Sequence, residues 1–160
     1  MKKVITYGTF DLFHEGHLNL LKQAKLLGDY LIVGITSDYF DKCRGKYNVH
    51  DSLMTRISNV QETGLADEIV IEEYFGQKID DIKKYGIDIF TVGSDWVGYF
   101  DYLREYCEVI YSKRTKGISS TQIRNTHSLK LGIIGGEKIV DRFLSEVSFI
   151  SGVSITGVYY

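Results

Sequence analysis

Two histidines, His14 and His17, flank Gly16 near the beginning of the chain. A short β-rich run ends shortly before them, and an apolar pattern with helical spacing starts at Gly16, so they lie where a strand gives way to a helix. A helix N-terminus offers unpaired backbone N–H groups and a partial positive charge, which suits phosphate. Gly16 permits close approach of a phosphate to the backbone, and imidazoles can donate hydrogen bonds to oxygens that gain charge in a transition state. The spacing therefore predicts a phosphate site with catalytic donors.

Other polar and aromatic residues follow later strand-like runs. By itself, the pair Arg44 and Lys46 is typical of a solvated face. Asp95 could accept hydrogen bonds from hydroxyl or amino groups, while Trp96 could equally pack in a core. Arg114 is the stronger candidate, because a planar guanidinium binds phosphate oxygens in a bidentate manner.

The elements that must position these residues alternate between strand and helix patterns. Strands are predicted over Lys2–Tyr7, Tyr30–Ile35, Glu68–Ile71, Ile87–Val92 and Val109–Tyr111. Helices are predicted after Gly16, over Asp51–Glu62 with Asp51 as N-cap, over Gln77–Tyr85 and Tyr99–Glu105, and from Ser119, while Ser37–His50 reads as irregular. This alternation predicts an α/β fold with a parallel sheet covered on both faces, whose ligands bind at the carboxyl ends of the strands.

Composition limits the classes of protein that remain. The 160 residues suffice for one domain, or for one domain and a fragment of another. The net charge of −2 argues against a nucleic-acid partner. Cys43 and Cys107 do not have the spacing of a disulfide framework or of a metal pair. No apolar run approaches the roughly 20 residues of a membrane span, and no signal peptide is recognised, so we expect a cytoplasmic protein without a membrane partner.

Three segments resemble signatures of the cytidylyltransferases, a family of the H-x-G-H nucleotidyltransferase superfamily. Thr9–His17 (TFDLFHEGH) is similar to T-F-D-x-x-H-x-G-H, and Arg114–Thr121 (RTKGISST) is similar to R-T-x-G-I-S-T-T. Between them, Gly93–Trp96 (GSDW) looks like the family's G-D-D-W element. The resemblance covers residues 1–127 and implies a Rossmann-like doubly wound parallel sheet of nucleotidyltransferase type.

The resemblance implies transfer of a cytidylyl group from CTP to a polyol phosphate, with release of pyrophosphate. The catalytic positions of the family correspond to His14, His17, Lys46 and Arg114. Thr9 and Phe10 would line the phosphate loop, and Asp11 would orient the loop or the substrate. Arg56 matches a family arginine after one inserted residue, or is an ordinary exposed helix arginine. The residues expected to bind CTP or the acceptor phosphate are Thr9, Phe10, Asp11, Gly16, Arg44, Arg56, Gly93, Asp95, Trp96, Thr115, Gly117, Ile118, Ser119 and Ser120.

The resemblance also implies a homodimer and a divalent cation, usually Mg²⁺, held mainly by phosphate oxygens and water. No dedicated cage of carboxylates is visible in the sequence.

Three positions depart from the family pattern. Ser94 stands where an aspartate is usual, Lys116 where a glutamate is usual, and Ser120 where a threonine is usual.

The opening segment is most similar to members that use glycerol 3-phosphate. Ribitol 5-phosphate and amino-alcohol phosphates remain alternative acceptors. An adenylyl transferase or a nucleotide-binding regulatory module without turnover are the alternative functions.

The tail, residues 128–160, has a separate pattern. Strands are predicted over Leu129–Ile134 and Val153–Tyr160. The stretch Leu131–Gly136 (LGIIGG) and the downstream Asp141–Phe143 resemble the start of an NAD(P)-dependent oxidoreductase domain of the glucose–fructose oxidoreductase type. Some thirty residues are too few for a dinucleotide-binding domain, so we expect an inactive stump and a possible fused or partner oxidoreductase.

Overall fold

The computed structural model describes residues 1–113 and the strands at 129–134 and 153–159. Five parallel strands form the main sheet, in the order β3-β2-β1-β4-β5. They are β1 (Lys3–Gly8), β2 (Tyr30–Thr36), β3 (Glu68–Glu72), β4 (Ile89–Gly93) and β5 (Glu108–Ser112). The chain order reverses between β1 and β4, which makes the carboxyl ends of these two strands the expected ligand position in a doubly wound sheet.

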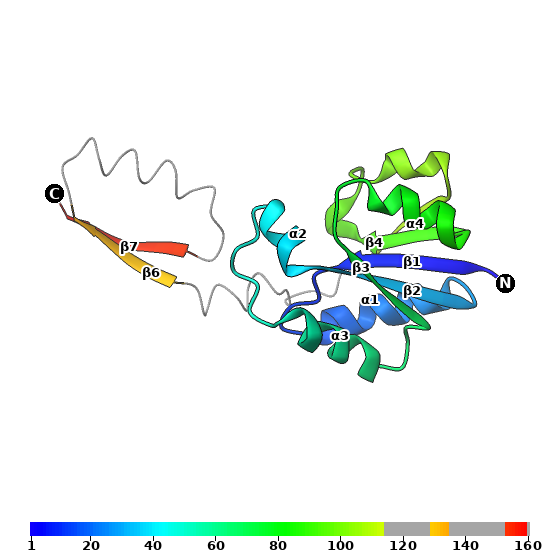
Figure 1. Ribbon diagram of the computed structural model, residues 1–160, viewed down its shortest axis with the longest axis horizontal. Helices are drawn as coiled ribbons and strands as arrows, with labels where there is room; N and C mark the ends of the chain where they lie inside the picture. The colour runs from blue at the N-terminus through cyan, green and yellow to red at the C-terminus, as the bar shows by residue number, and fades with distance from the viewer. Residues whose placement is uncertain (114–128, 135–152, 160) are drawn as a thin grey trace.

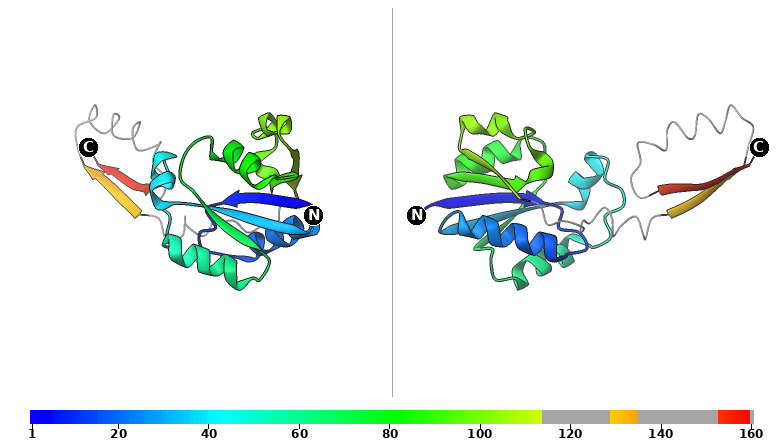
Figure 2. Two further views of the ribbon diagram at one scale, coloured as in Figure 1. Left: turned by 45° about the vertical axis from the view of Figure 1, so that its right-hand side comes forward. Right: turned by 180° about the vertical axis from the view of Figure 1, so that it is seen from behind.

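Helices cover both faces of this sheet (Figure 1). The helices are α1 (Glu15–Leu26), α2 (Asp38–Cys43), α3 (Leu53–Glu62) and α4 (Gln77–Tyr85), with 3₁₀ turns η1 (Ser94–Trp96) and η2 (Asp101–Glu105). Helices α1 and α3 lie on one face and α4 lies on the other, as the views from two further directions also show (Figure 2). The predicted α/β, Rossmann-like, doubly wound architecture is therefore confirmed.

Two apolar clusters hold the layers together, one on each face. On the first face, Leu21 and Ala24 of α1 pack with Val60 of α3 against alternate residues of the strands. On the second face, Ile82 of α4 and Leu103 of η2 pack against the opposite side. Strands that are buried on both faces read as continuous apolar runs, which is why Leu31–Val33 was recognisable from sequence.

Two predictions about the segment after β2 were wrong. Residues 38–43 form the helix α2, because the Ser37 hydroxyl caps it by accepting a hydrogen bond from the Phe40 N–H at 3.0 Å. Helix α3 begins at Leu53 with Ser52 as its N-cap, whereas Asp51 had been predicted to cap it. The Asp51 carboxylate instead accepts a hydrogen bond from the Leu12 N–H at 3.1 Å. It therefore fastens the loop after β1.

The two predicted tail strands are present as β6 (Leu129–Ile134) and β7 (Val153–Tyr159), which pair in parallel. The predicted helix from Ser119 lies outside the described residues. Among the residues that the structure describes, no helix has the length and apolar character to cross a membrane.

Candidate active site

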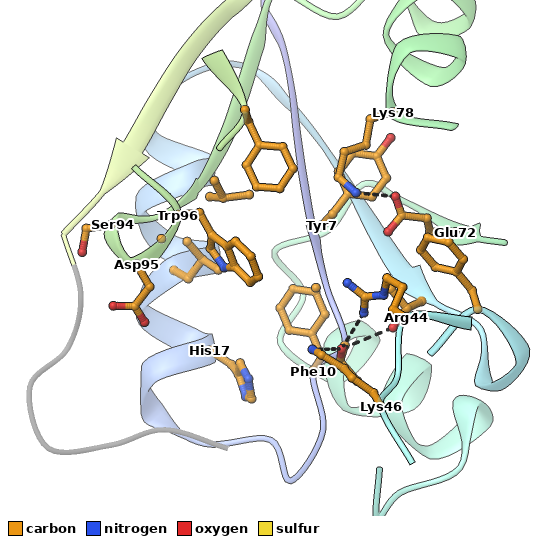
Figure 3. Close-up of a pocket in the computed structure, with 18 of the residues that line it drawn as sticks. Tyr7, Phe10, His17, Arg44, Lys46, Glu72, Lys78, Ser94, Asp95 and Trp96 are labelled. Carbon is orange, nitrogen blue, oxygen red and sulfur yellow. Dashed lines mark hydrogen bonds and ion pairs between the residues drawn. The ribbon is translucent and has the colours of Figure 1, made fainter. Parts of the chain in front are cut away.

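A pocket of about 490 Å³ opens at the carboxyl ends of β1, β2 and β4, at the reversal of strand order. Figure 3 shows its two walls: His17, Asp95 and Trp96 stand on one side, and Arg44, Glu72 and Lys78 stand on the other. The sequence-predicted residues that line it are Thr9, Phe10, His14, Gly16, His17, Arg44, Lys46, Gly93, Asp95 and Trp96. The fold thus brings together residues from the first loop, from the segment after β2 and from the end of β4.

His14 and His17 form the start of α1. His14 is the N-cap, and its Nδ1 accepts a hydrogen bond from the Gly16 N–H at 3.0 Å. The Nδ1 of His17 accepts one from the His14 N–H at 3.3 Å, and the two rings stack with centroids 3.9 Å apart. Because both Nδ1 atoms are acceptors, each neutral ring carries its proton on Nε2. Burial lowers the pKa of His14, which favours this neutral form. The pair can therefore donate two N–H groups without being charged.

The loop between β1 and α1 is conformationally strained. Phe10 and Leu12 both adopt positive φ, at 55° and 49°. Such angles are unusual for large side chains and cluster at functional sites. Phe10 is held there because its ring is buried, lies against Gly8, and contacts the His17 ring with centroids 5.4 Å apart. A Cβ on Gly8 would lie 2.9 Å from the Phe10 ring, so the loop requires glycine at this position.

The hydroxyl of Thr9 is a meeting point for two cationic side chains. Lys46 Nζ lies 3.2 Å and Arg44 Nη2 3.4 Å from Thr9 Oγ1, as the dashed lines in Figure 3 mark. Arg44 is also fixed by the buried carboxylate of Asp41 at 3.0 Å and by the face of Phe40 at 5.1 Å. The fold thus gathers two cationic side chains at the Thr9 hydroxyl on the pocket lining, and cations in this position suit an anionic ligand such as a phosphate.

Asp11 is buried and lies behind the pocket. Its two carboxylate oxygens accept hydrogen bonds from the backbone N–H groups of His50 and Asp51, at 2.9 and 2.8 Å. It thus ties the first loop to the segment before α3. Of the two roles predicted for Asp11, orientation of the loop is the one that this geometry supports.

Arg56 is also absent from the pocket lining, and its side chain is completely buried. Its guanidinium donates to the carbonyl oxygens of Thr9 and Thr36, at 2.9 and 2.7 Å, and pairs with Asp38 at 2.7 Å. It therefore joins the ends of β1 and β2. Neither prediction for Arg56, as a substrate ligand or as an exposed helix arginine, has support in this geometry; it is a positioning residue.

The wall formed by β3 and α4 was missed by the sequence analysis. Glu72, at the end of β3, and Lys78, in the first turn of α4, form a buried ion pair at 2.5 Å. Tyr7, Phe100 and Tyr102 line the pocket around this pair. The sequence carried one signal: Lys78 follows a strand end by only a few residues, in a helix start that faces the same edge of the sheet.

The opposite wall consists of η1 at the end of β4. Trp96 is 43% exposed, and its ring contacts Tyr99 and Phe100. Ser94, which replaces the usual family aspartate, also lines the pocket. An exposed aromatic face beside the Asp95 carboxylate can stack on a base and accept its donors.

Six predicted site residues lie outside the described part of the chain, namely Arg114, Thr115, Gly117, Ile118, Ser119 and Ser120. Lys113, which precedes them, lines the pocket.

The described residues contain no group of three or more His, Cys, Asp or Glu side chains that could hold a metal ion. The carboxylates among the described residues that line the pocket are Glu72 and Asp95, and Glu72 is paired with Lys78. This donor set fits an ion that is carried mainly by substrate phosphates, as Mg²⁺ commonly is.

Comparison with known proteins agrees with this site. The profile of the cytidylyltransferase-like family matches residues 5–126. This chain belongs to the cytidylyltransferase-like family. It is 55% identical over 124 residues to a glycerol-3-phosphate cytidylyltransferase of Bacillus spizizenii, covering 78% of this chain and 95% of that protein. It is 45% identical to a protein of the same name in Staphylococcus aureus, covering 78% of this chain and 93% of that one.

A solved structure shares the fold. The lipopolysaccharide core biosynthesis protein of Thermoplasma volcanium superposes with a TM-score of 0.60 at 24% identity, over 74% of this chain and 99% of that chain. The family match ends before the tail, and the resemblance of residues 128–160 to an oxidoreductase stays a prediction.

Proposed function

We propose that this cytidylyltransferase transfers the cytidylyl group of CTP to glycerol 3-phosphate, giving CDP-glycerol and pyrophosphate. The observation that carries the proposal is the stacked pair His14 and His17 at the start of α1, which lines one pocket together with Arg44 and Lys46. The acceptor follows from the relatives, two of which are glycerol-3-phosphate cytidylyltransferases and are aligned over nearly their whole length. The product would serve synthesis of a cell-wall or capsular polymer.

In this reaction an oxygen of the acceptor phosphate forms a bond to the α-phosphorus of CTP. The bond from that phosphorus to the bridging oxygen of the β-phosphate breaks, and its electron pair leaves with pyrophosphate. Little covalent work falls to the protein, so positioning and charge stabilisation supply the rate. His14 and His17 donate to the α-phosphate and leaving-group oxygens as their charge rises. Arg44 and Lys46 hold the anionic groups in place.

The remaining predicted residues complete the proposal. Trp96 and Asp95 contact the cytosine nucleoside, and Gly16 and Gly93 allow close approach of the nucleotide to the backbone. Arg114 would grip the triphosphate, and the other predicted ligands of CTP or the acceptor phosphate in the same signature would be Thr115, Gly117, Ile118, Ser119 and Ser120. Mg²⁺ would neutralise part of the triphosphate charge. The phosphate oxygens and water would hold it.

We propose a cytoplasmic homodimer, formed by a cytidylyltransferase domain over residues 1–127. Residues 128–160 would belong to a second α/β segment of oxidoreductase type. The parallel pairing of β6 and β7 suits such a segment, because parallel neighbours need a crossover connection.

Pyrophosphate release tests the function. The enzyme is assayed with CTP or ATP and Mg²⁺, in separate reactions with glycerol 3-phosphate, ribitol 5-phosphate and phosphoethanolamine. We expect turnover with CTP and glycerol 3-phosphate. Preference for ATP would indicate an adenylyl transferase. Binding of CTP without pyrophosphate release, with any of these acceptors, would indicate a regulatory module.

A further inference from the structure

The ion pair of Glu72 and Lys78 occupies the wall of the pocket opposite Trp96 (Figure 3). The side chains are nearly inaccessible, with exposed fractions of 2% for Glu72 and 14% for Lys78. Both residues line the pocket, although an ion pair of this kind contributes little to stability when its desolvation is counted. Its position at the ligand suggests a role in recognition.

The surroundings hold the pair rigidly. Gln77, next to Lys78, donates to the Ile71 carbonyl at 2.7 Å and accepts from the Glu73 N–H at 2.7 Å, so it joins the end of β3 to the start of α4. On the same helix, Asp81 accepts a hydrogen bond from the buried hydroxyl of Tyr7 at 2.8 Å. These contacts join the backbone segments that carry Glu72 and Lys78 to each other and to β1.

The ammonium of Lys78 lies over two aromatic rings. Its Nζ is 4.7 Å from the centroid of Tyr7 and 5.5 Å from that of Phe100, within the range of a cation–π contact. Aromatic faces next to a carboxylate are what a protein uses to bind an organic ammonium. Here the Lys78 ammonium itself occupies the position over the two rings, so the ammonium of an incoming ligand would meet a like charge.

One oxygen of the Glu72 carboxylate can accept hydrogen bonds from a neutral ligand. Lys78 is bound to Oε2, and within residues 1–113 no donor contacts Oε1. Ligand hydroxyl groups can donate to a carboxylate oxygen without bringing any charge into the site. The pair therefore suits a ligand that carries hydroxyl groups and an anionic phosphate, and opposes one that carries an ammonium.

Resting on the proposed function, we infer that Lys78 and Glu72 make the enzyme selective for polyol phosphates against amino-alcohol phosphates. Lys78 excludes the ammonium of phosphoethanolamine or phosphocholine because its own ammonium occupies the position over the rings of Tyr7 and Phe100. Glu72 accepts hydrogen bonds from the hydroxyl groups of the polyol.

The test measures kcat/KM by pyrophosphate release from CTP, with glycerol 3-phosphate and with phosphocholine, in the full-length protein. In Lys78→Met, the preference for glycerol 3-phosphate should fall by about 100-fold, since the like charge that opposes the ligand ammonium is lost while an apolar stem remains. Lys78→Arg should keep the preference. Glu72→Gln should raise KM for glycerol 3-phosphate and still reject phosphocholine. The double variant K78M/E72Q, which leaves no unpaired buried charge, should fold and also lose the preference.

Lys83→Met is the matched control. Lys83 belongs to the same helix and lies over Tyr106 at 5.1 Å, outside the pocket. This change should leave both acceptors unaffected. A dissociation constant for CTP equal to that of the wild type shows that each variant is folded.

An unchanged acceptor preference in both Lys78→Met and K78M/E72Q would overturn the inference, as would efficient use of phosphocholine by the wild type. Wild-type turnover with ATP in place of CTP, at the same acceptor preference, would contradict the proposed nucleotide and uphold the inference.

Discussion

The two walls of the pocket are built in different ways. On one wall, Phe10, His14 and His17 come from one continuous loop and helix start, and the geometry of the two histidines depends on local hydrogen bonds; we call this part the histidine wall. The lysine wall, formed by Tyr7, Glu72, Lys78 and Tyr102, comes from four separate elements that only the folded sheet brings together. The first wall holds groups suited to the phosphate chemistry, and the second holds groups suited to choosing the acceptor. The histidine donors are thus positioned by residues that are neighbours in sequence, whereas the groups proposed to select the acceptor are positioned by the arrangement of the strands and helices.

Loss of Arg56 should have the largest effect, because this residue joins the histidine wall to the rest of the sheet. Arg56→Met would leave the carbonyl oxygens of Thr9 and Thr36 without a donor in a buried place. We expect a loss of about 3–5 kcal/mol in the free energy of unfolding, measured by urea denaturation. Asp38→Asn is the control: this partner of Arg56 is 58% exposed, so its loss should cost less than about 1 kcal/mol. Equal effects would mean that the buried carbonyls do not matter.

Sequence predicted the histidine wall well and the lysine wall poorly, for a physical reason. His14, Gly16 and His17 are neighbours in sequence, so a motif can report them. Glu72 and Lys78 are separated by a turn and lie on different elements, and a glutamate at the end of a strand is usually exposed. Arg56 was placed on a helix surface or at the substrate for the same reason, since burial of a charge depends on partners that arrive from distant strands.

The fold was predictable because the apolar runs are distinct. Gln77–Tyr85 has the same bounds in prediction and in structure, helped by Gly76 and Gly86, which flank it with positive φ of 89° and 63°. The start of α3 was predicted less well. Asp51 and Ser52 are both good N-caps, and the choice between them depends on the bond of Asp51 to the backbone of Leu12. That bond exists only in the folded protein.

Removal of either histidine donor should be the next largest effect. In His14→Ala or His17→Ala, kcat should fall by about 10²–10³, because the donors act mainly on charge that develops in the transition state. Single-turnover assays with CTP and glycerol 3-phosphate measure this directly. His50→Asn serves as the control, since this exposed ring lies outside the pocket. A His17→Ala enzyme with wild-type kcat would remove the histidine wall from the chemistry.

Acidification should lower the stability of the protein through His14, the N-cap of α1. Burial lowers the pKa of His14 below its usual value of 6.5 in the unfolded chain. Its contribution to stability is therefore fully present above pH 6.5 and is lost as the pH falls through the folded-state pKa. The structural reason is that a protonated Nδ1 can no longer accept from the Gly16 N–H. In thermal melts between pH 7.5 and 5.5, the wild type should lose more stability than His14→Asn, whose amide oxygen can cap at either pH. Because an N-cap contributes about 1 kcal/mol, the two proteins should differ by no more than that in the free energy of unfolding lost on acidification. Parallel curves would show that His14 does not titrate against the cap.

Deletion of the tail should have the smallest effect on catalysis. The family match ends at residue 126, and every sequence-predicted site residue precedes that point. Every described residue that lines the pocket lies at or before Lys113. A chain that ends at residue 127 should therefore keep kcat and KM for CTP within about twofold of the full-length values, which is the range of ordinary surface changes.

Strands β6 and β7 form a two-stranded sheet, which is marginal when it stands alone. Their removal should thus alter solubility or oligomeric state before it alters turnover, and light scattering beside the kinetic assay separates the two. A folded truncation with a greatly reduced kcat would show that the tail completes one of the pocket walls.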